Sequence, residues 1–133
     1  MRILIVDDDR ATRLCLTRKL ETMGAIDTAG TGLEALDAFG RALAEGKPFQ
    51  LVCLDIVMPG LDGQATLQAM RDLEKQHGVA PGKETKVIMV TALGDTGNVS
   101  KAFFKGQADG YVTKPLHQAN LAKVLREMGF TIR

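Results

Sequence analysis

The sequence predicts an α/β fold, a doubly wound sheet of five parallel strands with helices on both faces. Five short apolar segments alternate along the chain with helical patterns, which is the order of repeated strand–helix units. Three of the segments are near-continuous runs of Val, Ile, Leu and similar residues, as expected of strands covered on both faces. No repeat or linker interrupts the 133 residues, so residues 1–133 are expected to form one domain.

The strands are assigned to the apolar segments. They are Ile3–Val6, Ala25–Ala29, Leu51–Leu54, Val87–Val90 and Gly110–Thr113. The second of them, AIDTA, is short and half polar, so it gives the weakest strand signal.

Helices are assigned where apolar residues recur at helical spacing between the strands. The supporting sets, in chain order, are Leu16, Leu20 and Met23; Leu36, Phe39 and Leu43; Val99, Ala102, Phe103 and Gly106; and Leu121, Val124, Leu125 and Met128. Gly24, Gly46 and Gly78 each follow a helical pattern, where a C-terminal cap favours glycine. The polar stretch HGVAPGKET at 77–85 predicts an exposed loop after the third helix.

Composition excludes several classes of protein. With 17 basic and 16 acidic residues the net charge is +1, so no basic surface indicates nucleic acid or membrane as a partner. No segment has the roughly 20 apolar residues of a membrane span, and the first residues do not resemble a signal peptide. The cytoplasm is the expected location.

The cysteines and histidines are isolated along the sequence. Cys15 and Cys53 lack the spacing of a zinc or redox motif and are expected to be buried; His77 and His117 are expected at the surface.

Chemically active side chains follow four of the predicted strands. The first strand leads into Asp7–Asp9, the third into Asp55, the fourth into Thr91 and the fifth into Lys114. In open parallel sheets, ligands bind beyond the carboxyl ends of the strands. Each residue also has a structural explanation. The first three acids could open a helix, Asp55 could cap a turn, Thr91 could begin a loop and Lys114 could be solvated. Their convergence on one edge nevertheless predicts a site.

This combination suits magnesium and phosphate. Clustered carboxylates repel one another unless a cation joins them, and their hard oxygens favour Mg²⁺ over zinc. A lysine and a threonine hydroxyl can bind phosphate oxygens, and an aspartate can be the nucleophile that forms an acyl phosphate. The sequence therefore predicts phosphoryl transfer, which needs mainly positioning and charge neutralisation.

Four motifs, ILIVDDD, LDIVMPGLDG, IMVTA and ADGYVTKP, together resemble the receiver domain of two-component response regulators. The resemblance covers essentially the whole chain and is closest to the single-domain, chemotaxis-regulator type. It implies a flavodoxin-like sheet with strand order 2-1-3-4-5, Mg²⁺ as cofactor, and a histidine kinase or histidine phosphotransfer protein as phosphodonor.

The resemblance also implies residue roles. Asp55 is the expected phosphoacceptor and Asp8 the direct metal ligand, while Asp7 acts through a metal-bound water. The backbone carbonyl of Val57 completes the protein ligands. Asp9 is given no metal role.

Further roles concern the fourth and fifth strands. Thr91 is expected to bind the phosphoryl group and move toward it, with Tyr111 as the coupled rotamer switch. Lys114 is expected to pair with Asp55 or with the phosphoryl oxygens, and the bond to Pro115 is commonly cis in this family.

Two apolar residues are expected to tune the lifetime of the phosphorylated state. Val57 lies two positions after Asp55, and Leu93 two after Thr91, places that flank the path of water to the phosphoryl group in receivers. Neither side chain can orient a water molecule by hydrogen bonding. The alternative is that both only pack their loops.

The resulting expectation is a signalling switch that catalyses only its own phosphorylation and dephosphorylation. Without an output domain it would act on a downstream protein through the surface of the fourth helix, fifth strand and fifth helix, as a monomer or weak phosphorylation-dependent dimer.

Three alternative functions are considered. A haloacid-dehalogenase-type phosphatase needs an acid where Val57 stands, and an FMN carrier should have a first loop rich in Ser, Thr and Gly. The third alternative is an interaction module that works without phosphorylation.

Overall fold

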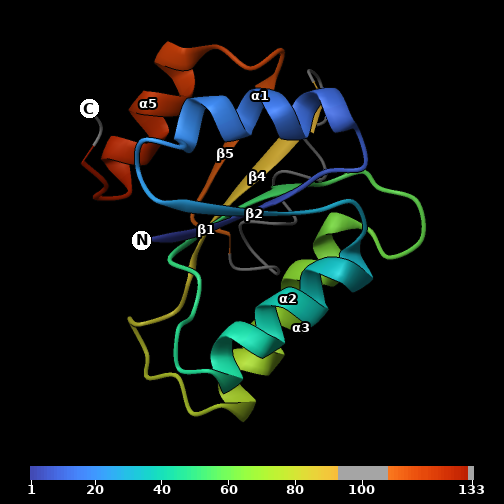
Figure 1. Cartoon of the computed structure of the whole chain (residues 1–133), viewed down its shortest axis with the longest axis vertical. Coiled ribbons are helices and arrows are strands. Elements are labelled where there is room, and N and C mark those ends of the chain that lie inside the picture. Colours follow the sequence, from blue (N-terminus) through green and yellow to red (C-terminus); the bar gives the residue numbers. More distant parts are fainter. Residues whose placement is uncertain (93–107, 132–133) are drawn as a thin grey trace.

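The structure, a computed structural model, describes residues 1–92 and 108–131, and these residues form the predicted five-stranded parallel sheet (Figure 1). Its strand order is β2-β1-β3-β4-β5, as expected. The strands are β1 (Arg2–Val6), β2 (Ala25–Ala29), β3 (Leu51–Asp55), β4 (Lys86–Ala92) and β5 (Gly110–Lys114). The helices are α1 (Arg10–Leu20), α2 (Gly32–Ala44), α3 (Gly63–Gln76) and α5 (Gln118–Glu127). The helix predicted from Val99 to Gly106 lies outside the described residues.

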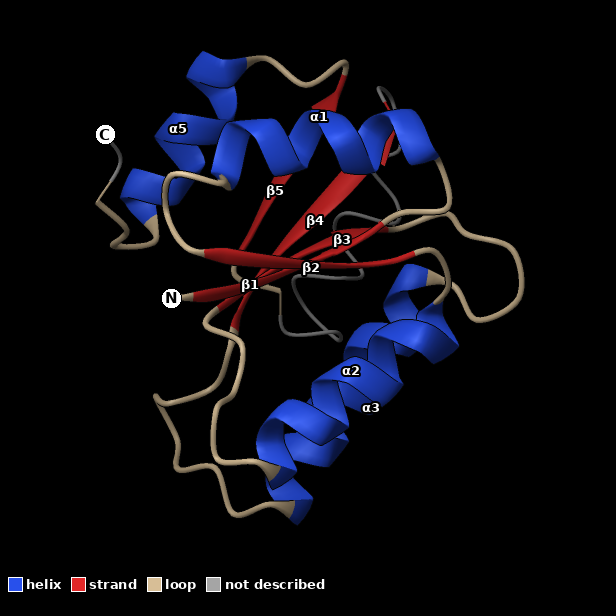
Figure 2. Ribbon diagram, in the orientation of Figure 1, coloured by secondary structure: helices blue, strands red, loops and turns tan. Residues whose placement is uncertain are grey.

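The sheet separates two hydrophobic clusters. Helices α1 and α5 cover one face and α2 and α3 the other (Figure 2). Because successive side chains of a strand point to opposite faces, Ile3 and Ile5 of β1 pack in the cluster under α1 and α5, while Leu4 and Val6 pack under α2 and α3. All four are buried, which explains why this strand has no polar alternation. None of the described helices has the length and hydrophobicity to cross a membrane.

Three strands continue further toward the carboxyl edge than their apolar segments predicted. Asp55 is the last residue of β3 and pairs with Val90, Thr91 belongs to β4, and Lys114 ends β5. The backbone ladder does not depend on side-chain polarity, so these polar residues keep strand geometry. Asp55, Thr91 and Lys114 therefore lie within the sheet itself, where strand pairing fixes their backbones.

The glycines after the helices have two different roles. Gly46 and Gly78 have φ of +72°, the left-handed conformation expected of a C-terminal cap. Gly24 is not among the described glycines with positive φ, so its prediction as a cap was wrong. A Cβ at Gly24 would overlap the carbonyl oxygen of Met1, and the chain requires glycine there for close approach between two segments.

The isolated cysteines and histidines lie mostly where the sequence suggested. Cys53 is buried in β3, and burial raises the pKa of its thiol to about 12. Cys15 on α1 is only partly buried, and both cysteines are free. His77 and His117 are exposed at helix ends.

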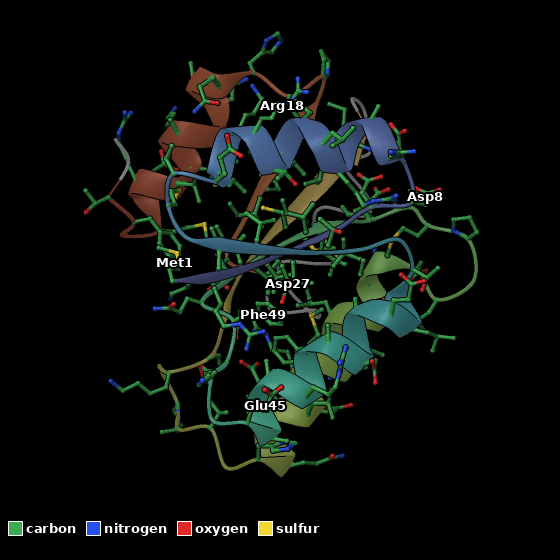
Figure 3. All side chains as sticks on the ribbon, in the orientation of Figure 1. Met1, Asp8, Arg18, Asp27, Glu45 and Phe49 are labelled. Carbon is green, nitrogen blue, oxygen red and sulfur yellow. The ribbon has the colours of Figure 1, made fainter. Side chains whose placement is uncertain are left out.

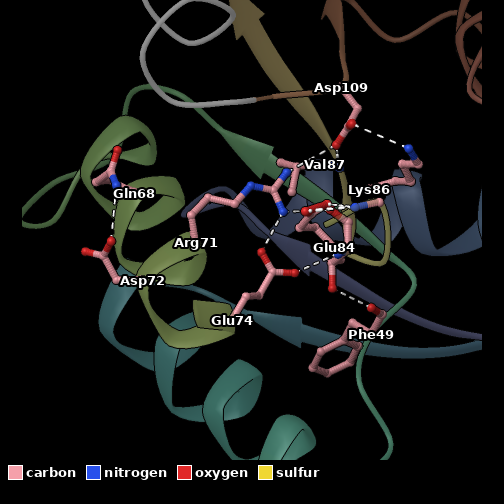
Figure 4. Close-up of polar contacts among 11 residues, drawn as sticks. Phe49, Gln68, Arg71, Asp72, Glu74, Glu84, Lys86, Val87 and Asp109 are labelled. Atoms are coloured by element: carbon pink, nitrogen blue, oxygen red, sulfur yellow. Dashed lines mark hydrogen bonds and ion pairs between the residues drawn. The ribbon is translucent and has the colours of Figure 1, made fainter. Parts of the chain in front are cut away.

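A buried network of charges ties α3 to the amino ends of β4 and β5 (Figure 4). Nη1 of Arg71 donates to Oε1 of Glu74 and to the carbonyl of Thr85, both at 2.8 Å, and Nη2 donates to Asp109 at 3.2 Å. Glu74 accepts from the Thr85 amide at 2.7 Å, and Asp109 accepts from the Val87 amide at 2.8 Å. Arg71 and Glu74 are nearly inaccessible to water, so each depends on the other for charge compensation.

This dependence makes Arg71 a stability determinant. We expect Arg71→Met to lower the free energy of unfolding by roughly 3–5 kcal/mol, because it leaves the Glu74 carboxylate buried without its partner. Urea denaturation measures the change. The control is Arg41→Met, which removes an exposed pair with Asp37 and should cost less than about 1 kcal/mol. Equal effects of the two substitutions would contradict a structural role for the network.

Candidate functional site

Three carboxylates converge at the carboxyl edge of the sheet. Asp7 and Asp8 follow β1, Asp55 ends β3, and one oxygen of each lies within 4.8 Å of the others. The convergence follows from the parallel register, which pairs Val6 with Leu54 and so brings the next residues of both strands side by side. Asp7 and Asp55 are buried, whereas Asp8 is exposed where the chain enters α1 (Figure 3).

Lys114 brings a positive charge to the cluster from β5. Its Nζ lies 3.2 Å from Oδ2 of Asp7 and 3.7 Å from Oδ2 of Asp55. In the strand order, β4 separates β5 from β3, and both β3 and β4 separate it from β1, so the long lysine side chain spans the carboxyl edge of the sheet. The Lys114–Pro115 peptide bond is cis, as the resemblance implied.

The charges of the cluster are incompletely balanced. Burial, and then the negative charge of Asp7, raise the pKa of Asp55 to about 7, although Lys114 and the amide of Val57 lower it. Burial alone would lower the pKa of Lys114, but the charges of Asp55 and Asp7 outweigh it and raise that pKa. One lysine therefore does not neutralise the acids, and a further cation would be stabilised here.

One oxygen of Asp7 has the character of a ligand atom. Oδ1 accepts the amide hydrogen of Asp9 at 2.9 Å, whereas the buried Oδ2 accepts no hydrogen bond from the described residues and faces both the Lys114 ammonium nitrogen, 3.2 Å away, and the like charge of Asp55. A buried carboxylate oxygen without a hydrogen bond is costly unless a cation compensates it. The cluster contributes oxygen donors, with no imidazole or thiolate among the three residues, which fits Mg²⁺ and not zinc.

Asp9 has a different task from the two acids before it. Its carboxylate accepts from the amide of Ala11 at 3.2 Å and from the hydroxyl of Thr12 at 2.8 Å, so it is the N-cap of α1. The hydrogen bond from Thr12 is the main reason that the pKa of Asp9 is lowered. The run of three acids thus divides into two cluster residues and one helix cap.

The loop after β3 is packed tightly beneath the predicted acceptor. Oδ1 of Asp55 accepts from the amide of Val57 at 3.2 Å, while the Val57 side chain is 62% exposed beside it. The amide of Gly63 donates to the carbonyl of Ile56 at 2.9 Å, and a Cβ at Gly63 would overlap the carbonyl oxygen of Asp55. Glycine therefore lets the first residue of α3 approach the end of β3.

The remaining predicted residues divide between the site and its surroundings. Thr91 is buried in β4, next to the residue that pairs with Asp55, and so lies at the same edge. Tyr111 is 45% exposed on β5 and lines a groove of about 470 Å³ between β5 and α5, and the three carboxylates are not among the residues that line this groove. Leu93 lies outside the described residues.

One contact to the site was not anticipated. Nη1 of Arg13, on α1, donates to the carbonyl of Asp7 at 2.7 Å. The sequence gives no signal that separates Arg13 from Arg10 or Arg18, since all three are basic residues of the same helix.

Known proteins share this sequence pattern. Residues 3–126 match the family described as "Response regulator receiver domain". Response regulator MprA of Mycobacterium avium is 36% identical over 129 residues, a match that covers 96% of this chain and 50% of MprA. Sensor histidine kinase GacS of Pseudomonas protegens is 34% identical over an alignment of 134 residues, a match that covers 99% of this chain and 14% of GacS. The chain thus spans half or less of the length of these two relatives.

Solved structures share the fold. The receiver domain of the histidine kinase CKI1 from Arabidopsis thaliana, complexed with Mg²⁺ and BeF₃⁻, superposes with a TM-score of 0.78 at 30% identity, covering 96% of this chain and 88% of that one. Vibrio cholerae chemotaxis protein CheY4 superposes with a TM-score of 0.76 at 24% identity, covering 95% and 96%, and supports the fold alone. With the family match over residues 3–126, these similarities establish that the chain belongs to the response regulator receiver domain family.

Proposed function

We propose that this receiver domain accepts a phosphoryl group on Asp55, in a Mg²⁺-dependent reaction, from a phosphohistidine of a histidine kinase or histidine phosphotransfer protein. The observation that carries the proposal is the cluster of Asp7, Asp8 and Asp55 with Lys114 at its edge. Two of the three acids are buried, and one of their oxygens accepts no hydrogen bond from the described residues. Such an arrangement is costly for a purely structural role and useful for binding a cation and a phosphoryl group.

In the proposed reaction a carboxylate oxygen of Asp55 attacks the phosphorus atom. A P–O bond forms to Asp55, the P–N bond to the donor imidazole breaks, and the imidazole leaves with the bonding electron pair. Lys114 offsets the negative charge of the transferred group, and Thr91 donates its hydroxyl to one phosphoryl oxygen. The protein contributes mainly by holding these groups on fixed strand ends, so that little reorganisation is needed.

Mg²⁺ would be held by Asp8 and Asp55 directly, by Asp7 through a bound water, and by the carbonyl of Val57. When bound it supplies charge neutralisation for the carboxylates and for the phosphoryl oxygens. The hard oxygen donors of the cluster support this assignment, as does the related CKI1 receiver domain, which was solved with Mg²⁺ and BeF₃⁻.

Phosphorylation would then change what the domain binds. Thr91 would move toward the phosphoryl group and Tyr111, now exposed, would turn inward to fill the space. The altered surface would include β5 and α5, and a downstream protein would recognise it. We place this switch in the cytoplasm, acting as a monomer or a weak phosphorylation-dependent dimer.

The acceptor assignment predicts that Asp55→Asn abolishes phosphorylation. Incubation with acetyl phosphate and Mg²⁺ should add one phosphoryl group to the parent chain and none to the variant, as measured by intact-protein mass spectrometry. The matched control is Asp9→Asn, because asparagine caps helices about as well as aspartate and the site is left intact. Phosphorylation of Asp55→Asn at the parental level would place the acceptor elsewhere.

The raised pKa of Asp55 predicts how the stability of the metal-free chain depends on pH. Between its ordinary value of 3.8 and its folded value of about 7, the folded state binds more protons than the unfolded state. The free energy of unfolding therefore falls as pH rises through this window. Asp55→Asn removes the effect, so the variant should exceed the parent by roughly 1–3 kcal/mol at about pH 8 and match it near pH 4.

Magnesium should stabilise the folded parent chain. Mg²⁺ binds only the folded parent and so raises its unfolding midpoint at about pH 8, whereas Asp8→Ala should gain little from the ion. Thermal unfolding with Mg²⁺ and with EDTA measures both effects. If the unfolding midpoint of the parent chain changed neither with pH nor with Mg²⁺, the result would argue against the proposed cation site.

The apolar side chains of Val57 and Leu93 predict a slow loss of phosphate. The double variant Val57→Asn, Leu93→Glu offers groups that can orient water, and we expect it to lose phosphate about ten times faster, equivalent to a barrier lower by about 1.4 kcal/mol. The remaining phosphoprotein is followed by mass spectrometry at matched Mg²⁺. Leu14→Asn changes an exposed leucine on α1 and serves as control. A double variant that keeps its phosphate as long as the parent would leave these residues with a packing role alone.

A further inference from the structure

The guanidinium group of Arg13 contacts the backbone of the acidic pair Asp7 and Asp8. Arg13 extends from the second turn of α1 back toward β1, and its Nη1 donates to the carbonyl oxygen of Asp7 at 2.7 Å in a partly buried position. That carbonyl belongs to the peptide unit that joins Asp7 to Asp8, the two acids that the first strand contributes to the cluster. A short hydrogen bond from a charged donor is among the stronger bonds available to a backbone carbonyl.

Other contacts hold the neighbouring parts of this segment. The amide of Asp7 donates to the carbonyl of Ala29 on β2 at 3.1 Å, and Oδ1 of Asp7 accepts from the amide of Asp9 at 2.9 Å. These bonds fix the backbone before the acidic pair and one carboxylate of it. The bond from Arg13 fixes the plane of the peptide between Asp7 and Asp8, which sets the direction in which Asp8 leaves the strand.

The fold provides a defined place for the guanidinium. A Cβ built at Gly30, in the segment between β2 and α2, would lie 3.4 Å from Nη1 of Arg13, so this side chain packs against a residue without one. At its base, Arg13 is anchored in the helix, since its amide donates to the carbonyl of Asp9 at 3.1 Å and its carbonyl accepts the hydroxyl of Thr17 at 2.8 Å.

We propose that Arg13 is a positioning residue of the cation site and contributes to its preference for Mg²⁺ over Ca²⁺. The inference rests on the proposed function, because it presumes that the carboxylate cluster binds Mg²⁺. Mg²⁺ requires nearly ideal octahedral geometry with short bonds, whereas Ca²⁺ accepts longer bonds and irregular arrangements. A contact that fixes the direction of Asp8 relative to Asp7 therefore matters more to Mg²⁺ than to Ca²⁺.

Position and charge have opposite consequences for cation binding. If Arg13 acted through its positive charge, it would repel either cation, and its removal would strengthen the binding of both. If it acts through the Asp7 carbonyl, its removal loosens the acidic pair and weakens Mg²⁺ selectively. Groups that orient metal ligands typically change metal affinity by about 10- to 100-fold when they are lost.

The test is isothermal titration calorimetry of the whole chain with MgCl₂ and separately with CaCl₂. We expect Arg13→Met to weaken Mg²⁺ binding by about tenfold or more, with a smaller change for Ca²⁺. Arg13→Lys keeps the charge and one possible donor, and should fall between the parent and Arg13→Met. The control is Arg18→Met, which removes an exposed arginine from the same helix and should bind both ions like the parent (Figure 3).

The outcomes separate this inference from the function on which it rests. No Mg²⁺ binding by the parent chain would overturn the cation site and the role of Arg13 together. Mg²⁺ binding by the parent, with unchanged affinity in Arg13→Met or with equal changes for the two ions, would overturn the role of Arg13 alone. If Arg13→Met does not fold, the Mg²⁺ and Ca²⁺ affinities of Arg13→Lys are compared with those of the parent in its place.

Discussion

The repulsion between two buried carboxylates, Asp7 and Asp55, is the interaction on which the site depends. Asp7 directly follows β1 and Asp55 ends the neighbouring parallel strand β3, so the register of the two strands brings them together. Lys114 compensates only in part, and burial together with the charge of Asp7 keeps the pKa of Asp55 raised to about 7. The rest of the local structure supports this strained electrostatic state: the end of β3 is braced by the close packing of Gly63, and the segment after β1 by Arg13. The crowding of these acids lowers the stability of this edge, which is the edge that we propose binds a cation and a phosphoryl group.

The two edges of the sheet manage charge in opposite ways. At the amino edge, Arg71, Glu74 and Asp109 are joined by hydrogen bonds at 2.8 and 3.2 Å, with further bonds to backbone amides. At the carboxyl edge, three acids face one lysine and an oxygen of Asp7 accepts no hydrogen bond from the described residues. The hydrogen-bonded charges at the amino edge fix the end of α3 that lies there, whereas the acids at the carboxyl edge form the cation site that we propose.

Most of the architecture could be predicted from the chain, because buried parallel strands leave near-continuous apolar runs such as Leu51–Leu54. The partition of the acids could not, since Asp8 and Asp9 are identical in kind and only the path of the backbone into α1 makes one a cluster member and the other a cap. The contact made by Arg13 could not be predicted from the sequence either, because the direction of its long side chain is set by tertiary contacts. β3 and β5 were each predicted to end one residue too early, because a charged residue was taken to mark the end of the strand.

The exposed place of Tyr111 on β5 has a practical consequence for following the protein in solution. The chain has one tyrosine and no tryptophan, so emission excited at wavelengths that phenylalanine does not absorb comes from a single ring, and that ring lines the groove between β5 and α5. Emission intensity and its quenching by iodide therefore report on one identifiable side chain, with no label and no engineered residue. The unmodified protein carries its own optical probe on the face that adjoins α5.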